Sequence, residues 1–280
     1  MFFNKIIKYF EYIPKQNYEF SLDMSTNNLP EEPEEQKNVF QSLPVNLEYI
    51  KTKYNTLINS DIVTREFKIP IRNIEYSAFL LYIDGMVNND SINDFILSPL
   101  LLKNSINMKP KDTTSTAVSR GISVKRVKKF NLEDFIFDSL IPQNSIKKED
   151  KFSEIVTMVN SGFCALFVDT ISSAFCIETR DIKCRSISQP MNENVIKGSQ
   201  EAFIENLRTN TAMIRKIVNN ENLIIEQCSV GKISKTSVAI CYLKNIANES
   251  LVSETKFRIN NLDIDYLTSS RTIRTVHSRQ

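Results

Sequence analysis

The sequence predicts an α/β fold with two lobes, each a mixed sheet with flanking helices, joined by two crossings of the chain. Three observations support this prediction. Apolar runs with strand spacing alternate with amphipathic stretches of helical spacing, and the order helix–strand–strand–helix occurs twice. A chain of 280 residues with 41% apolar side chains is also long enough to form two ordinary cores.

The N-terminal part, residues 1–43, is predicted to be a flexible tether. Residues 14–44 carry four prolines, Pro44 included, and an acidic cluster lies at 31–35, so we expect ordered structure to begin near Pro44. The elements predicted next are a helix at 46–59, strands at 61–69 and 77–83, and a helix at 91–103. The second of these strands is continuously apolar, which favours a central position in a sheet.

The middle of the chain is predicted to form a second block. Residues 109–120 lack periodicity and are interpreted as a linker. The elements predicted after it are a strand at 122–127, helices at 132–140 and 148–160, and strands at 162–169, 173–178 and 183–188. The last strand ends near Pro190.

The stretch 185–217 is the part around which we expect the rest to be organised. Gly198 supplies a turn, and Ser199 can cap a helix that runs to Val218. The apolar face predicted for this helix consists of Phe203, Leu207, Ile214 and Val218. Strands at 222–230 and 237–243 and a helix at 249–260 are predicted to follow.

The two helix–strand–strand–helix segments are predicted to be copies of one another. Asn46 recurs as Asn210, and Tyr82 recurs as Tyr242, with an offset of about 160 to 164 residues. A lone two-stranded hairpin is only marginally stable, so we expect the copies to share one sheet. The predicted domains are an outer lobe of 44–108 plus 192–268, an inserted lobe of 109–191 and a tail of 269–280, resembling a bilobed solute-binding protein. The alternative is two consecutive lobes that divide near residue 145.

The composition argues against several classes of function. The single histidine, His277, lies in the polar tail, so a histidine-based triad or a zinc site is not expected, and neither is a cofactor. The five cysteines have no CxxC spacing and are interpreted as buried, reduced thiols. A net charge of +2 and a basic run confined to 125–129 do not favour nucleic acid. We therefore predict that the chain is not an enzyme.

Two glycine-containing segments have alternative interpretations. Residues 231–236 contain half of a phosphate-binding loop, but the second glycine is missing and a strand follows, so we favour a hairpin turn. Lys197, Gly198 and Ser199 could present free amides and a positive charge to an anion, or Gly198 could simply supply the turn.

Three motifs in order resemble the A-subunit family of spore germinant receptors, the GerA type, over about residues 41–270. The first is Tyr82 to Met86, and the third is 231–242. The residues that fit the central motif are Arg185, Ile187, Pro190, Gly198, Glu201, Phe203, Glu205, Asn210, Ile214 and Arg215. Gln189, Lys197 and Ser199 depart from the family pattern, as does Thr170, where the family has glycine after Asp169.

The resemblance implies a function that composition does not. The chain would be the soluble, cytoplasmic N-terminal domain of a longer protein of the spore inner membrane. It would couple or assemble a nutrient-responsive, ion-conducting complex with B and C subunits and further A subunits. The expected signature and contact residues are Arg185, Pro190, Lys197, Gly198, Glu201, Phe203, Glu205, Asn210 and Arg215. Alternatives are a germinant sensor that binds its ligand in the inter-lobe cleft, or a sporulation-stage paralogue.

Overall fold

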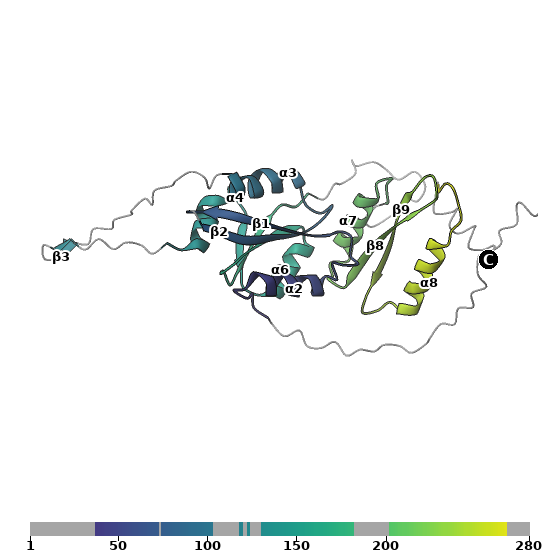
Figure 1. Ribbon diagram of the computed structural model, residues 1–280, viewed down its shortest axis with the longest axis horizontal. Helices are drawn as coiled ribbons and strands as arrows, with labels where there is room; N and C mark the ends of the chain where they lie inside the picture. The colour runs from purple at the N-terminus through teal and green to yellow at the C-terminus, as the bar shows by residue number, and fades with distance from the viewer. Residues whose placement is uncertain are drawn as a thin grey trace, which may run out of the picture. The chain divides into compact units, whose positions relative to one another are not determined.

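A computed structural model describes residues 37–72, 74–102, 118–119, 122–123, 130–181 and 202–267 (Figure 1). Packing divides the chain into two units, with Glu221 the last residue of the first and Asn222 opening the second. Three predicted segments lie outside the described residues: the linker at 109–117, the rest of the strand at 124–127 and the strand at 183–188.

The first unit contains a five-stranded antiparallel sheet with the strand order β1-β2-β6-β7-β5. Its strands are β1(Ile62–Ile71), β2(Ile74–Ile83), β5(Ile146–Glu149), β6(Phe163–Val168) and β7(Ala174–Glu178). Every residue of β6 is buried, and β2 lies between β1 and β6. The prediction that the apolar run at 77–83 is a central strand is therefore confirmed.

Helices cover both faces of this sheet. Alternate residues of β2 point to opposite faces, and because they are apolar on both, each face has to be covered. Phe79 and Leu81 belong to one buried cluster, together with residues of α2(Leu43–Lys53) and α6(Phe152–Asn160). Ala78 and Leu80 belong to the other cluster. That second cluster includes residues of α3(Asn89–Ile92), the π-helical η1(Asn93–Leu97), α4(Ser98–Leu102) and the π-helical η3(Ile136–Leu140), which continues α5(Leu132–Phe135).

In its described residues, the second unit consists of a hairpin and one helix. β8(Leu223–Val230) pairs antiparallel with β9(Thr236–Leu243), and α8(Glu249–Asn260) contacts β8. Elsewhere in the described part of the chain, β3(Val118–Ser119) pairs with β4(Ile122–Ser123).

The strand pairing corrects the predicted lobes, although the α/β class itself is confirmed. β2 pairs with β6 from Ala78↔Val168 to Leu81↔Ala165, so one sheet joins strands that were assigned to the outer and inserted lobes. The same pairing contradicts a division near residue 145. Among the described residues β8 and β9 pair only with each other. The physical reason is that β6 is wholly buried and therefore needs a paired strand on each side. The apolar residues Ala78 to Leu81 of β2 provide one of these partners. The likeness to a bilobed protein stays a prediction.

An asparagine side chain supports the predicted duplication. The Asn46 side chain accepts a hydrogen bond from the backbone N–H of Phe40 at 2.9 Å and donates one to the Phe40 carbonyl at 2.7 Å. Asn210 makes the same two bonds with Ile204, at 2.8 and 2.6 Å. Each asparagine reaches back six residues and lies in the first turn of its helix. We call this arrangement the asparagine bracket.

Contacts after the hairpins also correspond. In each copy the residue that follows the second strand donates its amide to the carbonyl that precedes the first strand, and an asparagine caps the next helix. In the first copy, the Asp84 N–H donates to the Asp61 carbonyl at 2.7 Å and Asn88 is the cap. In the second copy, the Lys244 N–H donates to the Asn222 carbonyl at 2.9 Å and Asn248 is the cap. The shared hydrogen bonds agree with two copies of one αββα segment.

Several predicted elements differ from the structure at their ends. The helix predicted at 46–59 is α2, which ends at Lys53 and is followed by a turn at 54–58. The start of the helix predicted at 148–160 is instead β5, since its residues pair with β7 from Ile146↔Ile177 to Glu149↔Ala174. Thr170 has φ +70°, so this β-branched residue takes a left-handed conformation where the family has glycine.

The cysteines differ partly from expectation. Cys164 and Cys176 are buried as predicted, and burial raises the pKa of the Cys176 thiol to about 12. Cys241 is exposed, because it lies on the solvent side of β9. Cys184 lies outside the described residues.

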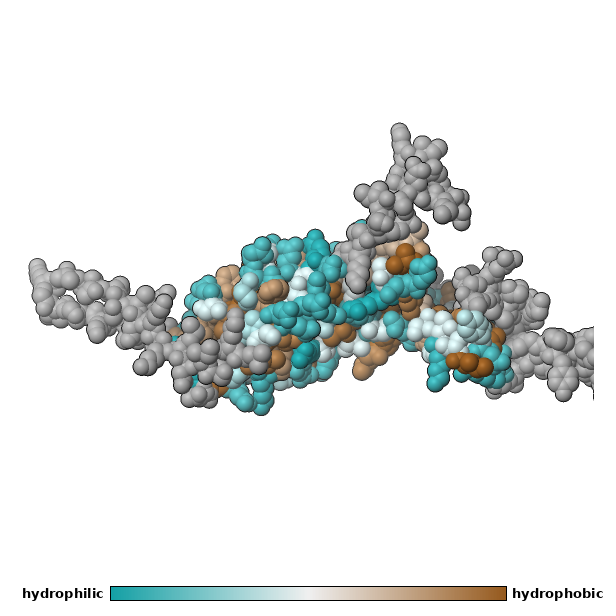
Figure 2. Space-filling view, turned by 90° about the horizontal axis from the view of Figure 1, so that it is seen from above, coloured by the Kyte–Doolittle hydropathy of each residue, from teal (hydrophilic) through white to brown (hydrophobic). Residues whose placement is uncertain are grey.

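The surface of the described residues mixes polar and apolar side chains, with scattered apolar patches in view (Figure 2). Large exposed apolar residues include Leu57, Phe203, Ile217, Ile233 and Ile246. Within the described ranges, each helix is too short or too polar to cross a bilayer.

Candidate functional site

The helix that was predicted from Ser199 to Val218 begins later in the structure. α7(Leu207–Ile217) is capped by Asn206, whose side-chain oxygen accepts a hydrogen bond from the Thr209 N–H at 3.1 Å. The predicted start at Ser199 is therefore wrong for this helix: residues 202–206 are not helical. The asparagine bracket gives the reason, because Asn210 holds the backbone of Ile204 in place before the first turn.

The helix buries a face different from the predicted apolar one. Its buried residues are Thr211, Ala212 and Arg215, and Phe203 lies outside the helix with 69% of its surface exposed. The prediction that Phe203, Leu207, Ile214 and Val218 form its core face is therefore wrong. Small side chains and one arginine make the contact instead, so the helix can approach the rest of the first unit closely.

Arg215 is the centre of a buried polar cluster. Its side chain is 1% exposed, and its guanidinium donates to both carboxylate oxygens of Asp61 at 2.8 and 2.9 Å. A further bond of 2.9 Å reaches the side-chain oxygen of Asn59. A bidentate pair with an added hydrogen bond is the geometry in which a buried arginine is best compensated. Arg215 therefore fixes the C-terminal end of α7 to the loop before β1.

Tyr54 adds a second buried polar group beside this cluster. Burial raises the pKa of the Tyr54 hydroxyl, although the nearby Arg215 acts in the opposite direction. The hydroxyl therefore stays protonated and donates a hydrogen bond to the Asn160 side chain at 3.1 Å. This bond links the C-terminal end of α2 to the C-terminal end of α6.

The other end of α7 is held by an ion pair at the surface. Arg208 pairs with Asp84, and both side chains are partly exposed. Asp84 and Asp61 are joined through their backbones by a hydrogen bond of 2.7 Å. Two arginines seven residues apart on α7 therefore bind the two acids at the open end of one hairpin.

Gly85 allows this close packing. Its φ is +88°, and a Cβ atom there would lie 3.1 Å from the Arg208 carbonyl oxygen and 3.3 Å from the Ala212 Cβ. Both the conformation and the close contact disfavour a larger side chain. Two motifs that are far apart in the sequence, Tyr82 to Met86 and the one containing Asn210 and Arg215, thus meet at a single interface. We call it the α7 docking site.

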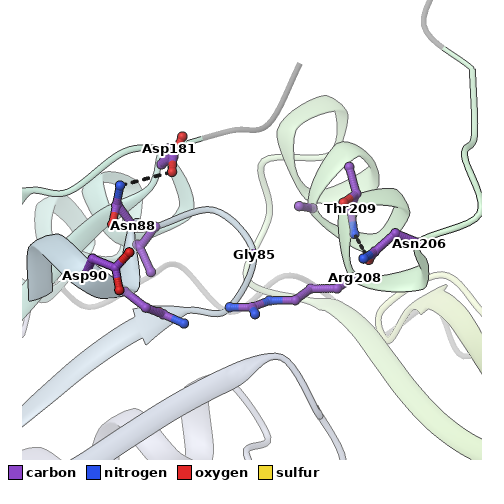
Figure 3. Close-up of a pocket in the computed structure, with 10 residues that line it drawn as sticks. Gly85, Asn88, Asp90, Asp181, Asn206, Arg208 and Thr209 are labelled. Atoms are coloured by element: carbon purple, nitrogen blue, oxygen red, sulfur yellow. Dashed lines mark hydrogen bonds between the residues drawn. The ribbon is translucent and has the colours of Figure 1, made fainter. Parts of the chain in front are cut away.

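A hollow of about 320 Å³ adjoins the docking site (Figure 3). Arg208 extends from α7 toward the loop at Gly85, and the Asn88 side chain donates to Asp181 at 3.1 Å across the opposite wall. The lining residues are Gly85, Val87, Asn88, Asn89, Asp90, Asp181, Asn206, Arg208, Thr209 and Ala212. The lining carries both positive and negative groups, so it could hold a small polar molecule.

The structure separates the predicted contact residues into three groups. Arg185, Pro190, Lys197, Gly198 and Glu201 lie outside the described residues. Phe203 and Glu205 are exposed. Asn210 and Arg215 contact their own chain, in the bracket and in the buried cluster. Reasoning from the sequence missed Asn59 and Asp61, because their partner lies more than 150 residues away.

The match to known proteins agrees with these motifs. The sequence matches the family described as Bacillus/Clostridium GerA spore germination protein over residues 48–279. The chain belongs to this GerA family. The A-subunit resemblance predicted from the three motifs is thereby confirmed.

GerA relatives differ in length and in name. The chain is 27% identical over 220 residues to spore germination protein KA of Bacillus subtilis, with 79% of this chain and 36% of that protein covered. It is 27% identical over 240 residues to stage V sporulation protein AF of the same organism, covering 86% of this chain and 44% of the relative. The chain thus spans less than half the length of these GerA relatives.

One solved structure is also similar. It is the crystal structure of the N-terminal domain of the A subunit of the Bacillus megaterium spore germinant receptor GerK3. The TM-score is 0.59 at 27% sequence identity, and the match covers 82% of this chain and 75% of the other. The fold described above is therefore similar to that of a germinant receptor A-subunit domain from the GerA family.

Proposed function

We propose that this chain is the domain of a germinant receptor A subunit that transmits a conformational change, with α7 as the connecting element. The α7 docking site is the observation that supports this role. Arg215 fixes one end of the helix in the first unit, and the chain then enters β8 after residues 218–222. A helix held in this way passes a displacement on instead of absorbing it.

The two ion pairs of α7 have different strengths. The Arg215–Asp61 pair is buried and hydrogen-bonded, so removing one partner is costly. The Arg208–Asp84 pair is partly exposed, where solvent and salt weaken ion pairs. The N-terminal end of α7 is therefore the end that can be released first. In our proposal, the Arg208–Asp84 pair must hold this end of α7 for the helix to transmit a displacement.

The remaining features of the proposal follow the family. The domain would lie on the spore-core side of the inner membrane and assemble with B and C subunits and with other A subunits. The complex would respond to nutrients and conduct ions at the start of germination. In this role the chain binds and transmits, and it performs no catalysis. Family membership and the likeness to the GerK3 A-subunit domain support this context.

Reversing the surface pair tests the role of α7. We expect Arg208→Glu or Asp84→Arg in the full-length protein to slow nutrient germination several-fold, because like charges would then face each other. The double variant restores the pair and should recover most of the rate. Arg65→Glu, at an exposed position of β1, is the control. The measurements are germination rates and A-subunit levels in spores.

Two outcomes would contradict the proposal. Normal germination of both single variants at normal protein levels would show that the pair transmits nothing. Spores that form abnormally would instead favour a sporulation-stage role, for which the similarity to stage V sporulation protein AF is the supporting observation.

The hollow beside Arg208 favours a second candidate function, direct binding of a small polar nutrient. Arg208 could bind a carboxylate, while Asp90 and Asp181 could bind an ammonium or hydroxyl group. We expect one nutrient class to raise the unfolding temperature of the chain in a saturable way. Asp90→Asn should weaken this effect. Thermal unfolding with amino acids, sugars and nucleosides is the measurement, and no shift with any of them would exclude the candidate.

A further inference from the structure

The turn between β8 and β9 holds the chain that returns from α8. Three successive backbone N–H groups point at two carbonyls of that returning segment. Lys232 donates to the Ile264 carbonyl at 3.0 Å, and Ile233 and Ser234 donate to the Asp265 carbonyl at 3.0 and 3.1 Å. The backbone amides of the turn therefore hold backbone that lies 31 or 32 residues further along the chain.

Side chains of the same turn hold the next part of the segment. The Leu267 N–H donates to the Ser234 hydroxyl at 3.3 Å, and the Thr236 hydroxyl donates to the Leu267 carbonyl at 3.3 Å. The hydroxyl groups of Ser234 and Thr236 are also hydrogen-bonded to each other, with their oxygens 3.0 Å apart. The Leu267 side chain is buried. Both backbone polar groups of Leu267 are thus fixed at the start of β9.

Gly231 permits the close approach. Its φ is +93°, and a Cβ atom there would lie 2.5 Å from the Ser234 hydroxyl oxygen and 3.3 Å from the Asp265 carbonyl oxygen. Nearby, the Lys232 ammonium pairs with Asp263 at 2.5 Å, and this contact raises the pKa of Lys232. The turn and the returning segment are therefore joined by backbone, hydroxyl and charged groups together.

This geometry explains the third motif of the sequence. The amides that a phosphate loop would direct at an anion are directed here at carbonyl oxygens of the chain itself. The glycine, serine and threonine of the motif each have a place in that contact. The favoured interpretation of a hairpin turn is correct, and the turn also has a second task.

We propose that Gly231, Ser234 and Thr236 form a clamp that fixes the segment from Ile264 to Leu267 to the β8–β9 turn. A displacement of this segment then moves the β8–β9 hairpin with it. This inference rests on the proposed function and extends its relay to the segment that follows α8. It assigns a positioning role to these three residues.

Hydrogen exchange of the whole chain tests the clamp directly. We expect Ser234→Ala with Thr236→Val to speed exchange of the Leu267 amide about tenfold or more, while amides of Ile224 and Ile240 within the hairpin keep their protection. Thr236→Ser retains the hydroxyl and should keep Leu267 protected. Ser237→Ala, at the exposed next position of β9, is the matched control. Unchanged protection of Leu267 in the double variant would overturn the clamp.

Germination of spores that carry the full-length double variant tests the consequence. We expect a several-fold slower response at normal protein levels. If Leu267 loses protection and germination is normal, the clamp transmits nothing and the inference fails. If the Arg208 and Asp84 reversals have no effect while the clamp variant is slow, the proposed role of α7 fails and the clamp stands.

Discussion

Replacing Arg215 by methionine is expected to lower the free energy of unfolding by about 3–5 kcal/mol. The substitution leaves the Asp61 carboxylate buried without its charged partner, and it removes a donor to Asn59. Methionine fills much of the same space, so the loss measures the missing charge and hydrogen bonds more than a cavity. Urea unfolding of the chain, followed by circular dichroism, is the measurement.

A double variant separates the charge from the packing. Asp61→Leu combined with Arg215→Met removes both buried ions, and we expect it to recover most of the lost stability, as replaced buried pairs often do. Lys51→Met is a control that removes the positive charge from the exposed pair between Lys51 of α2 and Glu66 of β1. A loss below about 1 kcal/mol for Arg215→Met would contradict the assignment, because that is the range of an exposed pair.

Substituting Gly85 by valine is expected to destabilise the chain by about 2–4 kcal/mol, from a left-handed backbone and from overpacking. The new side chain would meet the Arg208 carbonyl and the Ala212 methyl group, so α7 would have to move away. Faster hydrogen exchange throughout α7, with little change in β6, is the expected pattern.

A second substitution at Gly85 distinguishes the two causes. Asparagine accepts positive φ more readily than valine but also carries a Cβ atom. If packing against α7 dominates, Gly85→Asn should still loosen the helix. A Gly85→Asn variant with the protection of the original chain would show that the backbone conformation, and not the close contact, requires glycine.

Elements with local signals could be predicted from the sequence, and long-range partners could not. The predicted helices at 132–140 and 249–260 have the bounds of the structure, because asparagine caps at Asn131 and Asn248 mark their starts. The pairing of β2 with β6 has no such signal. Its four residue pairs lie almost ninety positions apart in the chain, which is why the predicted lobes were wrong.

The candidate site shows the same limit. Asn210 and Arg215 are predicted to be polar contacts of a lobe-bridging or subunit-contacting surface, and in the structure both form hydrogen bonds within their own chain. A helical pattern marks which residues share a face, and it cannot show that a buried arginine has an aspartate waiting 154 residues earlier. The motifs contain residues from both sides of the α7 docking site, and the structure shows which of them are in contact.

The asparagine bracket has a consequence for tracing ancestry. The asparagine side chain closes a hydrogen-bonded ring with main-chain atoms only. The bracket itself therefore requires no particular side chain at the five positions inside the ring. Phe40 to Asn46 and Ile204 to Asn210 have only two of seven residues in common, a leucine and the asparagine itself, yet their rings are the same. An internal duplication in such a chain is therefore easier to detect from shared hydrogen-bonded rings than from sequence alignment.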